Sequence, residues 1–572
     1  MKNLILLAQS DFQSLDVQGN KKKAEKIIQS AKQENVSAVI FPQLFLCGLP
    51  HGKVLTRFPQ IIKQNIQALN ELAKLSNNLK IIIGFIDKNY QNSLAVLSEG
   101  KIEKTINLDK NEFYKTEICG KKAGIVCFEN GWNENDFDIN SEFTKKIQIF
   151  VKENNFDFLI TPSASISRTG KEEKKHKFLK ELAVLYKCKI IYVNATGAND
   201  ALSFSGMSCV YDKSGELNAL AKAFEEQNLI IDLDTKNEIN TPPMNLDNFE
   251  EQQNFTLNYE YDLKRTYLSV VQAIRGYFKK CGFERAVLGL SGGLDSTVCA
   301  VLLTDALGKE NVLGISMPSK ITTSGSKNDA QELANNLGIS FFEQPIKDIF
   351  DATSKTFENV FENAQKKWSC RYSQSYTNDN IQARARANIL WGVANEFEKC
   401  IPIATSDKSE AYMGYATING DMSGGFAPIA DITKTKLFAL AKWLNKNRAE
   451  KNTIPQSVIE KRPGAELAIN PKTGKPLLAE EALMPYEFLD EVIWRIENLN
   501  QTKEEMKKSE FVYEKENKIS DEQKTQWLDK FFKRMSTAHY KWSISAPAPI
   551  IDRHSINSYE YVQPIVSSKI EY

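Results

Sequence analysis

The sequence of 572 residues predicts two α/β domains, an α/β sandwich with mixed sheets followed by a doubly wound parallel sheet. A chain of this length exceeds what one hydrophobic core usually organises. Short β-rich runs also alternate with longer amphipathic runs on both sides of a polar segment that begins near the pair Pro242-Pro243. The expected boundaries are 1–240 for the first domain, 241–258 for the linker and 259–572 for the second domain.

The first domain is expected to mix parallel and antiparallel strands. Strands are predicted at 3–8, 38–41, 80–85, 93–97, 124–128, 158–161, 190–193 and 207–211. Helices are predicted at 20–33, 59–75, 142–153 and 172–186. The runs 93–97 and 102–106 flank Glu99-Gly100 as in a hairpin, which indicates mixed sheets.

The second domain has the element order of a βαβαβ unit. After a helix at 259–283, strands are expected at 286–290, 311–317 and 340–344, with helices at 297–306 and 326–337 between them. Such a unit forms a parallel sheet that binds its ligand at the carboxyl ends of the strands. The strongly charged residues 500–525 are expected to form an exposed helix or a flexible insertion.

Composition excludes several classes of protein. Lys+Arg number 73 against 72 Asp+Glu, so there is no basic excess that would indicate a nucleic-acid partner. The 9 cysteines form no C-x-x-C pair and there are only 4 histidines, which argues against a disulfide framework and a structural zinc site. No run approaches the roughly 18 apolar residues of a membrane span, so a cytoplasmic protein is expected.

The loop Ser291-Gly-Gly-Leu-Asp-Ser296 joins a predicted strand to a predicted helix. Gly292 and Gly293 allow close approach of an anion to the backbone N–H groups of the helix start. Ser291 and Ser296 add hydroxyl donors, and Asp295 can bind the Mg²⁺ that accompanies a triphosphate. A glycine pair alone would favour an ordinary turn. The serines and the aspartate at these spacings favour phosphate binding instead.

This loop resembles the pyrophosphate-binding loop of the ATP pyrophosphatase ligases, and later segments are similar, in the same order, to motifs of NAD synthetase. These segments are Gly314–Lys320, Asn380–Arg386, Ala404–Glu410, Gly414–Asp421, Pro428–Thr435 and Pro463–Leu467. The resemblance implies that ATP adenylylates the carboxylate of deamido-NAD and that ammonia then displaces AMP, with pyrophosphate released in the first step. A carboxylate requires this activation because it is anionic and has no leaving group.

The resemblance also implies roles for individual residues. Asp295 and Glu410 are the expected Mg²⁺ ligands, and Lys408 and Lys434 the expected stabilisers of the transferring phosphoryl group. The remaining expected contacts are Thr405 and Thr433 to phosphate or carboxylate, Met317 and Ser319 near adenine, and Asp421 near the nicotinoyl end.

Arg384 and Arg386 are two residues apart and cannot share one helix face, so Arg386 is chosen as the substrate contact. Taken singly, most of these charged residues would be surface ion-pair residues. Two small departures from the family pattern are Ser406-Asp407 where Gly-Asn is common and Ala387 where methionine is common.

The first 240 residues resemble the nitrilase-like glutaminase domain that is fused to the synthetase in glutamine-dependent NAD synthetases. The matching segments are Ala38–Leu44, Asn92 with Gly100-Lys101, Gly124–Trp132, Ser163–Ser165 with Gly170-Lys171, and Tyr192–Asn194 with Phe204–Gly206. In that family a Glu-Lys-Cys triad frees ammonia from glutamine. The resemblance therefore implies a site for three catalytic side chains in this domain.

All three triad positions are changed when the family spacing is applied. Gln43 replaces the glutamate, and Phe128 falls at the cysteine when counted back from Trp132. Leu108 falls at the lysine, with Lys110 as the alternative if the spacing contains a small gap. An amide cannot act as a general base and a phenyl ring cannot act as a nucleophile. Cys127 precedes Phe128, and on a strand its side chain should point away from the nucleophile position. We therefore expect an inactive glutaminase domain, kept as a structural or oligomer-forming module.

The sequence thus predicts a ligase that uses free ammonia or ammonia from another protein, with Mg²⁺ as cofactor and ATP and deamido-NAD as substrates. A homo-oligomer built on a synthetase dimer is expected from the resemblance. Three alternatives stay open: amidation of nicotinate mononucleotide by the same chemistry, a non-catalytic regulator or scaffold, and an amidohydrolase that acts through the first domain.

Overall fold

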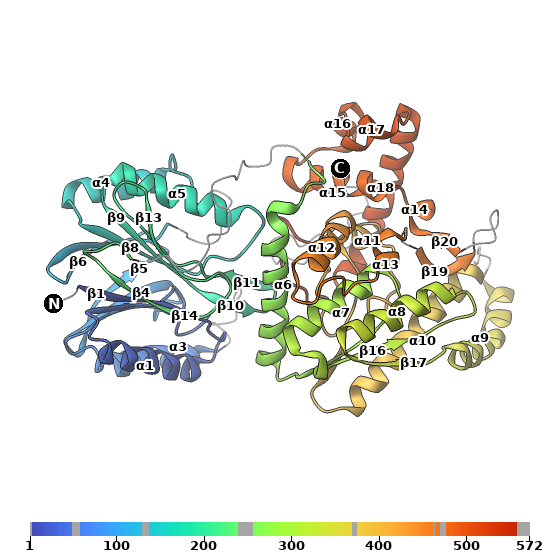
Figure 1. The fold of residues 1–572 in the computed structure, drawn as a ribbon, viewed down its shortest axis with the longest axis horizontal. Helices are drawn as coiled ribbons and strands as arrows, with labels where there is room; N and C mark the ends of the chain where they lie inside the picture. The colour runs from blue at the N-terminus through green and yellow to red at the C-terminus, as the bar shows by residue number, and fades with distance from the viewer. Residues whose placement is uncertain are drawn as a thin grey trace. The chain divides into compact units, whose positions relative to one another are not determined.

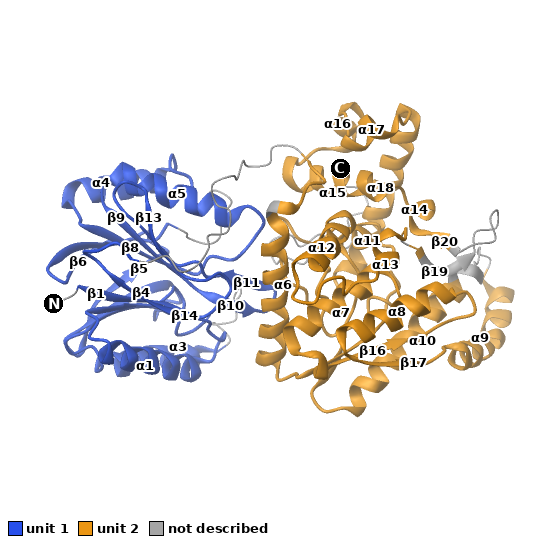
Figure 2. Ribbon diagram, viewed as in Figure 1, with its two compact units in different colours: residues 1–251 blue, residues 252–572 orange. Residues whose placement is uncertain are grey.

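The computed structural model describes residues 3–48, 58–128, 137–237, 255–368, 374–462, 464–469 and 476–556. The chain divides into two compact units, residues 1–251 and 252–572 (Figure 2). The predicted linker at 241–258 lies largely outside the described residues. Among the residues described, no helix is long and apolar enough to cross a membrane.

The first unit has four layers, with two sheets in the middle and helices outside each of them (Figure 1). One sheet has the order β14 (Gln227–Asp232), β1 (Leu4–Gln9), β2 (Ala38–Ile40), β3 (Lys80–Ile86), β4 (Asn92–Ser98), β5 (Lys101–Asn107). The other has the order β13 (Leu217–Leu220), β12 (Cys209–Tyr211), β9 (Lys189–Asn194), β8 (Phe158–Ser163), β7 (Lys121–Ile125), β6 (Tyr114–Ile118). The helices are α1 (Val17–Gln33) and α3 (Pro59–Ala73) on one side, and α4 (Glu142–Asn154) and α5 (Lys171–Tyr186) on the other.

The pairing of β4 with β5 confirms the predicted hairpin, and parallel pairs such as β7 with β8 make both sheets mixed. Side chains that alternate along the strands fill the space between the sheets, for example Ile5, Ile125 and Ile160. The opposite face of the second sheet packs against Phe178 and Leu182 of α5. The predicted α/β sandwich is therefore confirmed.

The second unit contains a parallel sheet in the order β17 (Ser340–Glu343), β16 (Val312–Ser316), β15 (Arg285–Gly289), β18 (Cys400–Pro402). The surrounding helices include α6 (Glu260–Cys281), α7 (Leu294–Leu307), α8 (Ser324–Leu337) and α10 (Gln374–Glu396). The chain runs outward from β15 to β17 and returns to β18 on the other side of β15. The order reverses there, which is where ligands bind in such sheets. The predicted parallel-sheet fold is confirmed.

Residues 500–525 differ from the sequence prediction. They form α16 (Lys503–Lys508), α17 (Val512–Asn517) and the start of α18 (Asp521–Trp542), which follow α15 (Tyr486–Leu499). Met506 and Phe511 are fully buried, and the ring of Phe511 stacks on that of Phe488 at 4.5 Å. Met506 of α16 and Phe511, which precedes α17, attach this charged segment to a core, so it is not a flexible insertion, although α17 itself buries no side chain.

Candidate active site

The glycine loop at the end of β15 leaves the start of α7 open to an anion. Gly292 has a φ of +74°, and a Cβ atom there would lie 2.0 Å from the carbonyl oxygen of Ser326, so only glycine fits. In the described part of the chain no side chain caps α7. The hydroxyls of Ser291 and Ser296 lie 3.1 Å apart at the mouth of the loop. This arrangement suits a phosphate at a helix N-terminus.

A cluster of charged side chains lies beside this loop. Lys434, the first residue of α12 (Lys434–Asn447), places its Nζ 2.7 Å from Asp295 Oδ1 in the first turn of α7. The same Nζ lies 3.1 Å from Glu410 Oε1 and 2.5 Å from Asp407 Oδ2. Asp407 precedes α11 (Lys408–Tyr412) and accepts a hydrogen bond from the Glu410 N–H at 2.9 Å.

Three carboxylates thus share one buried ammonium group. Burial raises the pKa of Glu410 to about 8 against the opposing effect of Lys434, and burial also raises the pKa of Asp295. Burial alone would lower the pKa of Lys434, but the surrounding carboxylates outweigh it and the pKa lies well above its ordinary value. The site therefore has an excess of negative charge.

Oxygen atoms of Asp295, Asp407 and Glu410 all lie within 4.8 Å of one another. Three carboxylate oxygens at this spacing fit a hard divalent cation such as Mg²⁺. The sequence pointed to Asp295 and Glu410 but missed Asp407. Asp407 stands directly before a helix, so the sequence explains it as an N-cap and gives no sign that it is also a possible metal ligand.

The other residues predicted to contact substrate lie at the ends of strands or the starts of helices. Thr405 and Thr433 are half-buried and precede α11 and α12. Met317 follows β16 and lies over Gly289, where a Cβ atom would be 2.9 Å from its Cε. Ser319 begins the turn that leads to α8 and its N–H donates to Thr322 Oγ1 at 3.0 Å. Met317 and Ser319 thus follow the carboxyl end of β16, and Thr405 follows the carboxyl end of β18.

The two arginines of α10 contact different segments, as their spacing of two residues requires. Arg386 Nε donates to the Met317 carbonyl at 3.0 Å. Arg384 Nε donates to the Ile418 carbonyl at 3.2 Å, in the turn where the Thr417 N–H donates to Asp421 at 2.6 Å. Arg384 and Asp421 therefore belong together. Arg386, chosen from the sequence as the substrate contact, instead bonds to the segment after β16, and its role at the substrate stays a prediction.

Lys408 differs from the sequence prediction. Its side chain is fully buried, and its Nζ lies 2.8 Å from Glu497, 3.2 Å from Asp431 and 2.8 Å from the His554 carbonyl oxygen. These two acids and the carbonyl oxygen lie around the ammonium, and none of them belongs to the Asp295 cluster. Lys408 is therefore a buried ion-pair residue that holds α11 in place.

Replacing Lys408 with methionine is expected to destabilise the second unit by about 3–5 kcal/mol, because the buried acids lose their partner. Calorimetry of thermal unfolding measures the change. Lys442→Met on the exposed face of α12 is the matched control and should leave the unfolding temperature nearly unchanged. Equal stability of the two variants would contradict the assignment.

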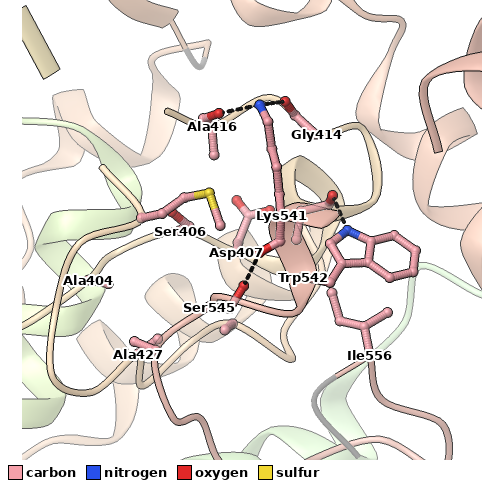
Figure 3. Close-up of a pocket in the computed structure, with 14 residues that line it drawn as sticks. Ala404, Ser406, Asp407, Gly414, Ala416, Ala427, Lys541, Trp542, Ser545 and Ile556 are labelled. Atoms are coloured by element: carbon pink, nitrogen blue, oxygen red, sulfur yellow. Dashed lines mark hydrogen bonds between the residues drawn. The ribbon is translucent and has the colours of Figure 1, made fainter. Parts of the chain in front are cut away.

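A small pocket lies next to Asp407 (Figure 3). Six of its 14 lining residues are alanines: Ala404, Ala411, Ala416, Ala427, Ala430 and Ala546. Lys541 Nζ donates to the carbonyls of Gly414 at 2.8 Å and Ala416 at 2.5 Å, and Trp542 Nε1 donates to the Ala411 carbonyl at 2.8 Å. Because these donors already bond to backbone carbonyls, the pocket suits a small uncharged molecule better than a phosphate.

The first unit contains a second polar site around Gln43. Its Nε2 contacts the thiol of Cys127 and donates to the Pro162 carbonyl at 3.0 Å, while its Oε1 accepts from Asn92 Nδ2 at 3.2 Å. Gln43 and Cys127 are both buried. Leu108 is also buried and belongs to the same core as Cys127. An amide, a thiol and a leucine thus occupy this region.

The position of Cys127 corrects the sequence-based assignment of Phe128. The strand does alternate sides, but Cys127 faces Gln43, and Phe128 packs on the opposite side against Phe178 at a ring distance of 5.3 Å. Counting back from Trp132 was therefore one residue out. Trp132 itself lies outside the described residues. A thiol therefore faces Gln43, and the expectation that the triad is lost now rests on Gln43 and Leu108 alone.

Comparisons with known proteins agree with both units. Residues 6–242 match the carbon-nitrogen hydrolase family, and residues 266–534 match the NAD synthase family. A glutamine-dependent NAD(+) synthetase of Thermotoga maritima is 33% identical over 86% of this chain and 88% of its own length. One from Aquifex aeolicus is 31% identical over the same shares.

Among solved structures, glutamine-dependent NAD+ synthetase from Acinetobacter baumannii in complex with ADP is 26% identical, with a TM-score of 0.69 over 100% of both chains. The similarity thus extends over both units rather than one. With two family matches in order and close relatives aligned along most of their length, the chain belongs to the glutamine-dependent NAD(+) synthetase family.

Proposed function

We propose that this protein makes NAD⁺ from deamido-NAD⁺, ATP and ammonia, releasing AMP and pyrophosphate. The observation that carries the proposal is the Asp295–Asp407–Glu410–Lys434 cluster beside an open glycine loop. The function named for the relatives agrees with it. The phosphates lie at the N-terminus of α7, and Lys434 stabilises the charge that develops as pyrophosphate leaves.

The reaction has two steps. A carboxylate oxygen of deamido-NAD⁺ attacks the α-phosphate of ATP, and the bond to pyrophosphate breaks. Ammonia then attacks the acyl carbon, AMP leaves and a proton is released. Mg²⁺ bound by Asp295, Asp407 and Glu410 would supply positive charge for the leaving pyrophosphate. Arg384 and Asp421 are assigned to the nicotinoyl end because Arg384 donates to the Ile418 carbonyl in the turn that Asp421 closes.

We propose that the ammonia comes from solution or from another protein. Gln43 supports this because its amide cannot accept the proton that a glutamate would take from the Cys127 thiol. Leu108 supports it because a buried leucine cannot stabilise an oxyanion. The pocket of small side chains beside Asp407 suits an uncharged molecule of the size of ammonia.

The test offers purified protein ATP, Mg²⁺ and one acid, with either ammonium or glutamine freed of ammonium. Deamido-NAD⁺ with ammonium should give NAD⁺ and equal amounts of AMP and pyrophosphate. Turnover of nicotinate mononucleotide in place of deamido-NAD⁺ would establish the alternative acid. Absence of pyrophosphate release with both acids would contradict the proposed function and favour a non-catalytic role.

We also propose that the second unit forms a dimer through α9 (Lys347–Lys367). This helix buries none of its described side chains, yet apolar residues recur along one face. Phe357, Val360 and Phe361 are 37%, 60% and 41% exposed, and Trp368 just after the helix is 72% exposed. A contiguous apolar stripe of this kind is typical of a protein interface. A second copy of this chain is the proposed partner, in keeping with the synthetase dimer that the sequence resemblance implies.

Val360→Glu is expected to shift the protein from dimer to monomer, since it places a charge in the centre of the stripe. Sedimentation velocity measures the change in mass. Lys355→Glu, which adds the same carboxylate on the opposite side of α9, is the control and should remain dimeric. A mass unchanged by Val360→Glu would place the interface elsewhere.

A further inference from the structure

One face of α15 runs along the starts of α11 and α12. Tyr486, Asp490 and Glu497 are spaced by four and seven residues, so they lie on the same side of the helix. The Tyr486 ring lies 5.3 Å from Lys434 Nζ. Glu497 accepts hydrogen bonds from Lys408 Nζ and from the Tyr412 hydroxyl, both at 2.8 Å. Along the helix, Asp490 lies between Tyr486 and Glu497.

Asp490 connects the two helices that carry the charged cluster. Its Oδ1 accepts from Ser409 Oγ at 2.5 Å, and its Oδ2 accepts from the Thr435 N–H at 2.8 Å and from Thr435 Oγ1 at 2.7 Å. Ser409 Oγ in turn accepts from the Lys434 N–H at 2.8 Å. Only 1% of Asp490 is exposed, and burial raises its pKa to about 7.

These partners adjoin the site directly. Ser409 precedes Glu410, and Thr435 follows Lys434. A movement of Asp490 would therefore shift the carboxylate of Glu410 relative to the ammonium of Lys434. Asparagine has almost the same shape, but it accepts with one oxygen only and would turn an NH₂ group towards a donor. An aspartate is needed here because three donors converge on its two oxygens.

We propose that Asp490 is a positioning residue of the adenylylation site. It fixes α11 against α12, so that Asp407 and Glu410 face Lys434 at the distances that ATP and its metal require. Asp490 touches neither substrate nor cofactor and acts through Ser409 and Thr435. The inference rests on the proposed function for the reaction, but the clamp itself follows from the contacts of Asp490.

The experiment compares Asp490→Asn with Glu491→Gln at pH 8, above the raised pKa of Asp490. Glu491 is a matched control because it is the next residue of α15 and is fully buried. It contacts Arg495 at 2.7 Å and the Val512 N–H at 2.7 Å, away from the charged cluster. Thermal unfolding, kcat, KM for ATP and calorimetric binding of ATP with Mg²⁺ are measured for both variants.

Both variants are expected to unfold at lower temperature. Only Asp490→Asn should lower kcat at least tenfold, with a smaller change in KM, and weaken Mg²⁺-dependent ATP binding. Equal kcat and equal ATP affinity in the two variants would overturn the proposal and leave Asp490 a stabilising residue. If Asp490→Asn does not fold, Ser409→Ala removes the same bridge and should give the same loss of kcat. ATP binding also reports on the clamp if the wild type fails to turn over deamido-NAD⁺.

Discussion

Lys434→Met is expected to lower kcat for NAD⁺ formation by about 10²–10³-fold, the usual effect of removing one stabilising group from a transition state. The ammonium is only 1% exposed and bonds to both Asp295 and Glu410. Without it the carboxylates repel one another and the developing pyrophosphate. Their pKa values should rise further, because burial then acts without an opposing cation. Steady-state kinetics with deamido-NAD⁺, ATP and ammonium measure the effect.

The same variant should depend on Mg²⁺ for its stability, since a divalent cation can replace the missing charge among the acids. Thermal unfolding of the variant is measured with Mg²⁺ and with a chelator, and the unfolding temperature should be higher with Mg²⁺. Lys442→Met on the same helix keeps the cluster intact and should match the wild type in kcat and in its response to Mg²⁺. A kcat of Lys434→Met within threefold of the wild type would exclude Lys434 from the reaction.

The glycine loop of the second unit and the charged residues beside it could be predicted because each is marked by a short stretch of sequence. Ser291-Gly-Gly places a tight turn between a strand and a helix, and the backbone of Gly292 indeed passes too close to Ser326 for any side chain. Asp295, Glu410 and Lys434 were found because each lies in the first turn of a helix, within a recognisable motif. The structure brings these distant segments together at the reversal of strand order beside β15.

What could not be predicted depends on contacts between distant segments. Lys408 and Lys434 look alike in sequence. Only the structure shows that Lys408 forms buried ion pairs with Glu497 and Asp431. Asp490 has no motif of its own, since its partners come from two other helices. The assignment of Phe128 failed for a different reason: one extra residue after a strand reverses which side chain faces the site.

Glutamine is expected to support NAD⁺ synthesis at less than about one hundredth of the rate with ammonium, because loss of a general base lowers such rates by roughly 10²–10⁴-fold. Cys127 faces Gln43, so a thiol remains where a nucleophile belongs. The Gln43 amide donates to this thiol and cannot take its proton. A neutral thiol is a weak nucleophile, and Leu108 offers no charge to stabilise a tetrahedral intermediate.

Cys127→Ala tests whether Cys127 acts as a nucleophile. If it does not, removing the thiol should leave the rates with ammonium and with glutamine unchanged. Cys47→Ala is the matched control: Cys47 is also fully buried in the first unit, and burial raises its pKa to about 12. Glutamine hydrolysis is followed as glutamate release from ammonium-free glutamine. If Cys127→Ala abolished that release while Cys47→Ala preserved it, the thiol would be a working nucleophile despite Gln43, and the chain would supply its own ammonia as its relatives' names imply.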